Sequence, residues 1–343
     1  MRQIQIEWVE LNKKVTADLI PDNNPELCDL LWERLPYTSI QTHALVSGHH
    51  LYHIAPIAEL VTTKAQFKVP DRTKSDDGTI FLSQLQHMAI KYGKLSEYLP
   101  AAPVGQVIAE HIPILKEAGE GCWDAVYRTK QVIEVRVSRK GDDSKKFYFP
   151  TFEEIKREPV RSLLKEIQDE TWRTWVKPPQ EILDIHAGAI RSGAGSCGQY
   201  FTTMLFVNGE TRPLGYSGFG GLMQLCKNPE ITLDTLQKVA PHFVKTPAEF
   251  LGYCGLDTLW SFTDRTLKLL PDLKSKEELF ALVSMLALYT NQLNAWNLHF
   301  FPWAEGKAYT FATQSETLKK EVFLDVAAQH ARSAKPISFT DME

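Results

Sequence analysis

Four of the chain's ten histidines lie within residues 43–53, at positions 43, 49, 50 and 53. Imidazole side chains this close together could bind a metal ion or transfer protons near neutral pH. A zinc or iron site needs three or four convergent ligands, usually with a carboxylate or thiol among them, and this segment has no acidic residue. The segment therefore favours an acid–base site and predicts no metal. Strand histidines without a special role stay open as the alternative.

The spacing of these histidines predicts how a hairpin would arrange them. Residues 47–48, Ser-Gly, fit a two-residue turn because glycine adopts positive φ. In that register residue 43 opposes 52 and residue 45 opposes 50, so His43 and His50 become diagonal neighbours on one face, together with Gln41. The other two histidines lie on the more apolar opposite face. We therefore predict that His43 and His50 transfer protons beside a pocket.

The first 140 residues read as strands with two helices. "QIQIEWVEL" alternates with period two, and "DGTIFLSQ", "HMAIKYG" and "QVIEVRVSR" are also strand-like. "NNPELCDLLWERLP" predicts one short helix with an Asn cap, Pro25 in its first turn and a stop at Pro36. "GQVIAEHIPILKEAGEG" can supply the second helix. Many strands with two helices indicate a small closed barrel with helical plugs.

The remaining sequence has helical periodicity. The polar run "SRKGDDSKK", residues 138–146, predicts a linker. A helical pattern that opens near Thr151 should be kinked or split by Pro159. A long helix should begin at Ser275, with Glu278 three positions later completing a capping box. We predict an α+β protein with a β-barrel domain over residues 1–143 and an all-α helical bundle over residues 144–343.

Composition and charge exclude several classes of protein. The formal net charge of -4 argues against binding nucleic acid by phosphate neutralisation. No apolar run is long enough to span a membrane, and the N-terminus lacks the apolar core of a signal peptide. Five scattered cysteines without a CxxC pair indicate reduced thiols in a cytoplasmic protein. Homo-oligomerisation stays open.

A glycine-rich segment in the second half, "RSGAGSCGQY", matches the dinucleotide fingerprint at residues 193, 195 and 198. That motif needs a buried strand before it and a helix after it, and the preceding "PPQEILDIHAGAIRS" reads as a polar helix. The segment therefore argues against nicotinamide binding. A turn between helices is one alternative. A cradle for a carboxylate, with Arg191 and Ser192, is the other.

The chain resembles a known family over most of its length. The segments "LPYTSIQTHALVSGHHLYHIAP", "DGTIFLSQLQHMAIKYGK" and "PVGQVIAEHIPIL" resemble the cyclophilin-like barrel of small prokaryotic proteins. Together with "GAIRSGAGSCGQYFTTMLFVNGETRPLGYSGFGGLMQL", the whole chain resembles the cucumopine and mikimopine synthases. Cyclophilins place a catalytic arginine on the strand before the equivalent hairpin turn, and here that strand reads Thr42-His43-Ala44, so prolyl isomerase activity is not expected.

This resemblance implies an opine synthase that needs no cofactor. Such enzymes condense L-histidine with 2-oxoglutarate in a Pictet–Spengler reaction, in which an imine forms and a carbon of the imidazole then attacks it. The substrates would be these two small molecules, with no nucleic acid or membrane partner. Acid–base chemistry would come from His43 and His50, assisted by Tyr92 or Lys91. The candidates for binding substrate carboxylates or orienting the imidazole are Gln41, Arg34, Lys94, Arg191 and Ser192.

Two other functions remain alternatives to the condensation. One is a reductive opine dehydrogenase that consumes NAD(P)H with the same pair of substrates. The other is a non-enzymatic cyclophilin-like binding module joined to a helical domain. Turnover without a reductant would distinguish the condensation from the reductive dehydrogenase. Turnover of any kind would distinguish it from the binding module.

Overall fold

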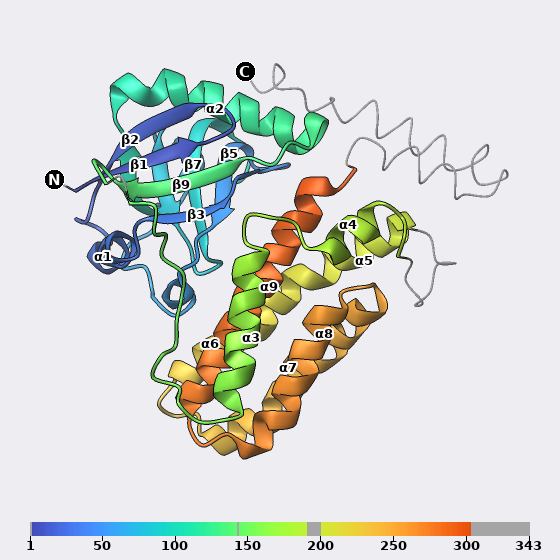
Figure 1. Ribbon diagram of the computed structural model, residues 1–343. Coiled ribbons are helices and arrows are strands. Elements are labelled where there is room, and N and C mark those ends of the chain that lie inside the picture. Colours follow the sequence, from blue (N-terminus) through green and yellow to red (C-terminus); the bar gives the residue numbers. More distant parts are fainter. Residues whose placement is uncertain (1, 143, 191–199, 303–343) are drawn as a thin grey trace.

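The protein folds into a β-barrel lobe and a helical lobe that lie against each other (Figure 1). The computed structural model describes residues 2–142, 144–190 and 200–302, and all structural statements refer to these residues. None of the helices in these ranges has an apolar stretch long enough to cross a membrane.

Nine strands form one antiparallel sheet in the order β3-β9-β1-β2-β8-β6-β7-β5-β4. The two ends of this sheet, β3 and β4, are consecutive in the chain and separated only by Gln41, so the sheet curls into a nearly closed barrel. The predicted α+β architecture is thereby confirmed. The strands are β1 (Gln3–Trp8), β2 (Lys13–Leu19), β3 (Tyr37–Ile40), β4 (Thr42–His43), β5 (Gly48–Ile54), β6 (Thr79–Leu82), β7 (His87–Leu95), β8 (Ala102–Val107) and β9 (Glu134–Arg139).

Buried and partly exposed residues alternate along β1, as the sequence indicates. Ile4, Ile6 and Trp8 are fully buried in the barrel core, and the residues between them are partly exposed. Gln41 closes the seam between β3 and β4. Its amide donates to the carbonyl oxygens of Thr42 and Tyr52, each at 2.8 Å, and its oxygen accepts a hydrogen bond from Trp8 Nε1 at 2.9 Å.

Two helices accompany the barrel, α1 (Pro25–Glu33) and α2 (Ile112–Asp124), and both predicted helices are confirmed. Asn24 stands at the N-cap of α1 as predicted, but its side chain does not cap the helix. Its amide instead donates to the carbonyls of Phe67 and Pro103, so it ties two distant segments together. The helix α2 lies across the barrel and continues into a π-helical turn, η4 (Ala125–Thr129).

The helical lobe consists of seven α-helices within the described ranges. They are α3 (Val160–Arg173), α4 (Gln180–His186), α5 (Tyr200–Pro213), α6 (Gly220–Lys227), α7 (Leu233–Tyr253), α8 (Asp257–Leu269) and α9 (Lys276–Phe300). A π-helical turn, η6 (Leu214–Phe219), joins α5 to α6. Pro159 immediately precedes α3, and residues 151–158 are not helical, so the helix begins after this proline and the prediction of a helix from near Thr151 is wrong.

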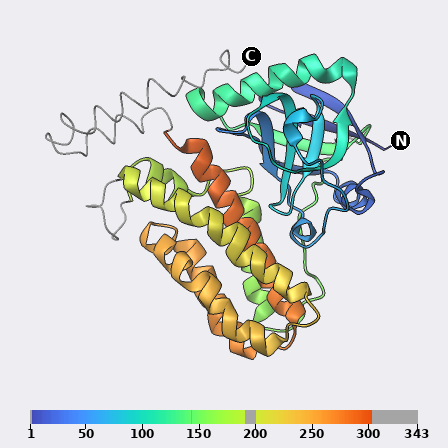
Figure 2. The ribbon, with the colours of Figure 1, turned by 180° about the vertical axis from the view of Figure 1, so that it is seen from behind.

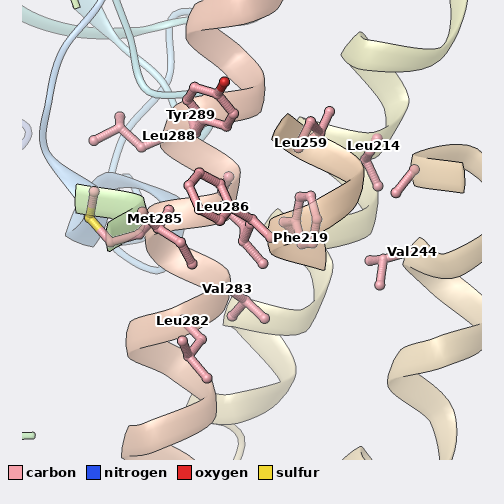
Figure 3. Close-up of a cluster of buried hydrophobic side chains, with 14 of the residues drawn as sticks. Leu214, Phe219, Val244, Leu259, Leu282, Val283, Met285, Leu286, Leu288 and Tyr289 are labelled. Carbon is pink, nitrogen blue, oxygen red and sulfur yellow. The ribbon is translucent and has the colours of Figure 1, made fainter. Parts of the chain in front are cut away.

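The longest helix, α9, forms the centre of the bundle. Nearly all of its residues are buried, as expected of a helix that is apolar on all sides. Figure 3 shows Leu282, Val283 and Leu286 of α9 beside Phe219 and Leu259 from other elements. At its start, Ser275 Oγ accepts a hydrogen bond from the Glu278 backbone, which confirms half of the predicted capping box. The Glu278 carboxylate instead pairs with Arg157 at 2.6 Å.

Buried hydrogen bonds dock the bundle onto the barrel. Trp175 Nε1 donates to the Thr38 carbonyl at 2.6 Å, and Asn291 of α9 donates to the Gln86 side chain at 2.9 Å. These bonds are far from bulk water, and breaking one would leave a buried group unsatisfied. The end of α9 therefore has a defined position against the barrel (Figure 2).

Candidate active site

A cavity of about 670 Å³ lies between the barrel and the bundle. This volume falls within the range of about 300–1,000 Å³ that is typical of small-molecule sites. Strands β4, β5, β6 and β7 form one wall, while α5, η6 and the end of α9 form the other. Apolar side chains on the barrel side include Phe81, Leu85 and Leu99.

The histidine segment forms the hairpin β4–β5, but with a register that differs from the prediction by one residue. His43 opposes Leu51 and Thr42 opposes Tyr52. Gly48 has the expected positive φ, but the Ala44 N–H donates to the His50 carbonyl, so the loop of the hairpin is longer than the predicted two-residue turn. The predicted register is therefore wrong, although His43 and His50 both line the cavity as proposed.

The other two histidines of the segment do not line the cavity. His49 stacks on Tyr92 with ring centroids 5.1 Å apart, and His53 forms a hydrogen bond with Tyr37 Oη at 2.9 Å. Burial lowers the pKa of His53 to about 3, so this imidazole is a neutral part of the barrel interior.

His43 is held in one tautomer by its neighbours. Its Nδ1 is 2.8 Å from the Ala44 carbonyl oxygen, which can only accept, so Nδ1 carries the proton. Its Nε2 is 2.6 Å from Tyr92 Oη and accepts that hydroxyl proton. Burial lowers the pKa of His43 to about 3, so the ring is neutral at pH 7. Tyr92 is itself buried and contacts His43 rather than the cavity.

His50 is only 5% exposed, and its Nε2 has no hydrogen-bond partner among the described residues. Burial, followed by the nearby charge of Arg72, lowers the pKa of His50 to about 3. This differs from the near-neutral titration expected from the sequence, because the side chain is buried in the folded protein. An unpaired buried imidazole nitrogen at a cavity is suited to hydrogen bonding with a bound ligand.

A group that sequence reasoning missed lies at the mouth of this cavity. Arg72, in the short 3-10 helix η2 (Arg72–Lys74), donates to Glu97 Oε2 at 2.5 Å, and Ser47 Oγ donates to the same oxygen at 2.5 Å. Glu97 is the only carboxylate among the described lining residues. No local signal marks Arg72 and Glu97, because both lie in irregular segments of ordinary polar composition.

The bundle supplies polar side chains that were also missed. Asn208 and Arg212 lie one helical turn apart on α5, and Tyr216 lies on η6. Tyr216 Oη is 2.7 Å from Nε2 of His87, the first residue of β7. Burial and the charge of Arg212 lower the pKa of His87 to about 3. The π-helical turn presents Tyr216 to the barrel, in keeping with the frequent occurrence of such turns at functional sites.

Four of the other predicted residues lie outside the lining of the cavity. Lys91 forms a buried ion pair with Asp77 at 2.7 Å, and Arg34 pairs with Glu59 at 2.6 Å. Gln41 closes the barrel seam, as described above, and Lys94 is exposed. These side chains already have partners or solvent, so the fold does not present them to a ligand in this cavity.

Some predictions fall outside the described ranges. Arg191 and Ser192, and with them the glycine pattern at residues 193–198, belong to the undescribed stretch 191–199. Of the cysteines, Cys28, Cys122 and Cys226 are buried free thiols, in agreement with the sequence. Cys254 is also buried, and Cys197 lies in the same undescribed stretch.

Comparison with known proteins shows what the whole chain is similar to. The family model described as the cucumopine synthase C-terminal helical bundle domain matches residues 160–300. A solved structure titled "Structure of McbB in complex with tryptophan" is 57% identical, with a TM-score of 0.86, and the match covers 89% of this chain and 99% of McbB. No curated protein matches the sequence.

A barrel and a helical bundle that enclose a cavity lined by histidines, with these similarities, define a Pictet–Spengler condensing enzyme. The chain belongs to the cucumopine synthase family, together with McbB.

Proposed function

We propose that the protein joins the amino group of an aromatic α-amino acid to a carbonyl compound by Pictet–Spengler condensation, with L-tryptophan as the amino acid. The similarity to a tryptophan-bound protein at 57% identity supports the choice of amino acid. The observation that carries the chemistry is the Arg72–Glu97 pair at the mouth of the cavity.

The pair is complementary to the polar end of an amino acid. An α-amino acid carries an ammonium and a carboxylate on the same carbon, and Glu97 and Arg72 present the opposite charges side by side. Arg72 Nε has no partner among the described residues and is free to donate to a carboxylate. The apolar wall of Phe81, Leu85 and Leu99 suits an indole ring.

The reaction needs a base at two points. The amine must lose a proton before its nitrogen attacks the carbonyl carbon, and the resulting carbinolamine loses water to give an iminium ion. A carbon of the aromatic ring then attacks the iminium carbon, and the ring recovers its aromaticity when that carbon loses its proton to a base.

Glu97 is placed to take these protons. Both hydrogen bonds that Arg72 and Ser47 make to its carboxylate go to Oε2, so Oε1 accepts none from them and remains available. His43, His50 and His87 are neutral, as their lowered pKa values require. We assign His50 and His87 to hydrogen bonding with the substrates, and His43 to positioning. The enclosing bundle would protect the iminium ion from water.

L-Histidine with 2-oxoglutarate, giving a cucumopine- or mikimopine-type product, is the second candidate. The match of residues 160–300 to the cucumopine synthase helical bundle favours this pair. An imidazole ring would attack the iminium ion in the same way as an indole ring, so the catalytic groups would be unchanged.

Mass spectrometry of mixtures tests the proposal directly. The purified protein should convert L-tryptophan and a carbonyl substrate, without reductant, into a product whose mass is their sum less one water. Parallel mixtures with L-histidine and 2-oxoglutarate rank the two candidates by kcat/KM. Consumption of NADPH with either pair would instead support a reductive dehydrogenase, and ligand-induced thermal shifts without any turnover would support a binding module.

A further inference from the structure

The two arginines that line the cavity differ in their surroundings. Arg72, on the barrel side, is paired with Glu97. Arg212, on α5 of the bundle, makes a cation–π contact with Tyr216, its guanidinium carbon 6.0 Å from the ring centroid. Arg212 is exposed, and no carboxylate of the described residues forms an ion pair with it.

The surroundings of Arg212 are those of an anion-binding group. Asn208, four residues earlier on the same helix, lines the cavity beside it and can add an amide N–H donor. Tyr216, which contacts Arg212, lies 2.7 Å from His87 Nε2, so Arg212 is near one of the histidines assigned to hydrogen bonding with the substrates. A planar guanidinium with a neighbouring amide is suited to bidentate binding of a carboxylate.

We propose that Arg212, together with Asn208, forms the subsite that binds a carboxylate of the carbonyl substrate. This inference rests on the condensation proposed above, in which the Arg72–Glu97 pair receives the amino acid. In that proposal Arg72 on the barrel wall binds the carboxylate of the amino acid. Arg212 on the opposite wall therefore remains for the carboxylate of the carbonyl substrate. The bundle thereby selects the carbonyl substrate, and the barrel selects the amine.

A matrix of substrates tests this assignment. L-Tryptophan and tryptamine, which lacks the carboxylate, are each combined with glyoxylate and with methylglyoxal, an aldehyde of similar size without a carboxylate. In Arg212→Gln we expect kcat/KM for glyoxylate to fall about 50-fold with either amine, the scale of a lost charge-assisted contact. For methylglyoxal we expect kcat/KM to change by less than about 3-fold. The kcat/KM of Arg212→Lys for glyoxylate should lie between those of the unmodified protein and Arg212→Gln.

Lys68 provides the matched control, because it is an exposed cation on the barrel side of the same cavity. Lys68→Gln should change kcat/KM only slightly, and by the same factor for all four pairs of substrates. A fall in Arg212→Gln that is equal for glyoxylate and methylglyoxal, or that follows the carboxylate of the amine, would overturn the subsite. A glyoxylate-selective fall in Lys68→Gln would also overturn it. Absence of product from every pair with the unmodified protein would overturn the proposed condensation, and the subsite with it.

Discussion

Arg72 and Glu97 are 25 residues apart in the chain, yet their side chains meet at 2.5 Å on the rim of the cavity between the barrel and the bundle. Neither residue lies in a β-strand, and each is positioned by an irregular segment packed on the barrel. The pair places a base and a cation together where the cavity meets solvent, and the first prediction depends on it.

Replacing Glu97 by glutamine should abolish the proton transfer without changing the shape of the site. An amide of the same size cannot accept the ring proton, so we expect kcat to fall by about 10²–10⁴-fold. The melting temperature should change little, because the carboxylate is at the cavity rim. Ser47→Ala is the matched control: it removes one hydrogen bond to the same oxygen and should lower kcat by less than about 10-fold. Near-normal turnover in Glu97→Gln would remove this residue from the mechanism.

Replacing Tyr216 by phenylalanine should disturb His87 rather than the fold. The hydroxyl of Tyr216 is the hydrogen-bond partner of His87 Nε2 at 2.7 Å, so its loss frees the imidazole to change tautomer. We expect kcat to fall by about 10-fold, with the ¹⁵N chemical shifts of the His87 ring changing at the same time. Unchanged ring shifts would show that Tyr216 does not set the state of His87.

The buried histidines should make stability fall in acid. His43, His50, His53 and His87 have their pKa lowered to about 3 in the folded protein, against an ordinary value of 6.5. Between those two values the unfolded chain binds more protons than the folded one, so the free energy of unfolding rises with pH. The stabilisation is complete above 6.5 and is lost as the pH falls toward 3.

Urea denaturation at a series of pH values checks this dependence. The free energy of unfolding should decrease steadily from pH 6.5 to pH 4.5, and His53→Gln should reduce that slope relative to the unmodified protein. A flat profile over this interval would show that the histidines are accessible to protons in the folded state.

Replacing Gly119 by alanine should loosen the support of His43. A Cβ atom on Gly119 of α2 would lie 2.5 Å from the ring of Tyr92, whose hydroxyl donates to His43. We expect the free energy of unfolding to fall by about 2 kcal/mol through overpacking. Gly209→Ala on α5 is the matched control, since a Cβ there meets no atom within 4 Å, and it should stabilise by up to about 1 kcal/mol. Equal stability of the two variants in denaturant would contradict the packing argument.

Local sequence patterns predicted the secondary structure correctly where it is determined by contacts between residues close together in the chain. The period of β1, the start of α1 at Pro25, the helix boundary at Pro159 and the Ser275 cap all depend on neighbours within a few residues. The predicted hairpin register was wrong because the loop between the paired residues Ala44 and His50 is longer than the predicted two-residue turn. Positive φ at Gly48 was expected from the turn, but a Cβ there would also collide with the backbone of Lys94 on β7, which the turn sequence does not reveal.

The sequence by itself determined that strands precede helices, and that His43 and His50 belong to one hairpin beside a pocket. The tertiary structure alone decided which groups meet at that pocket. Glu97 and Arg72 come together through irregular segments, and Tyr216 reaches His87 from 129 residues further along the chain. Burial in the folded protein also decided the charge of the histidines, because desolvation depends on everything packed around a side chain and not on its neighbours in sequence.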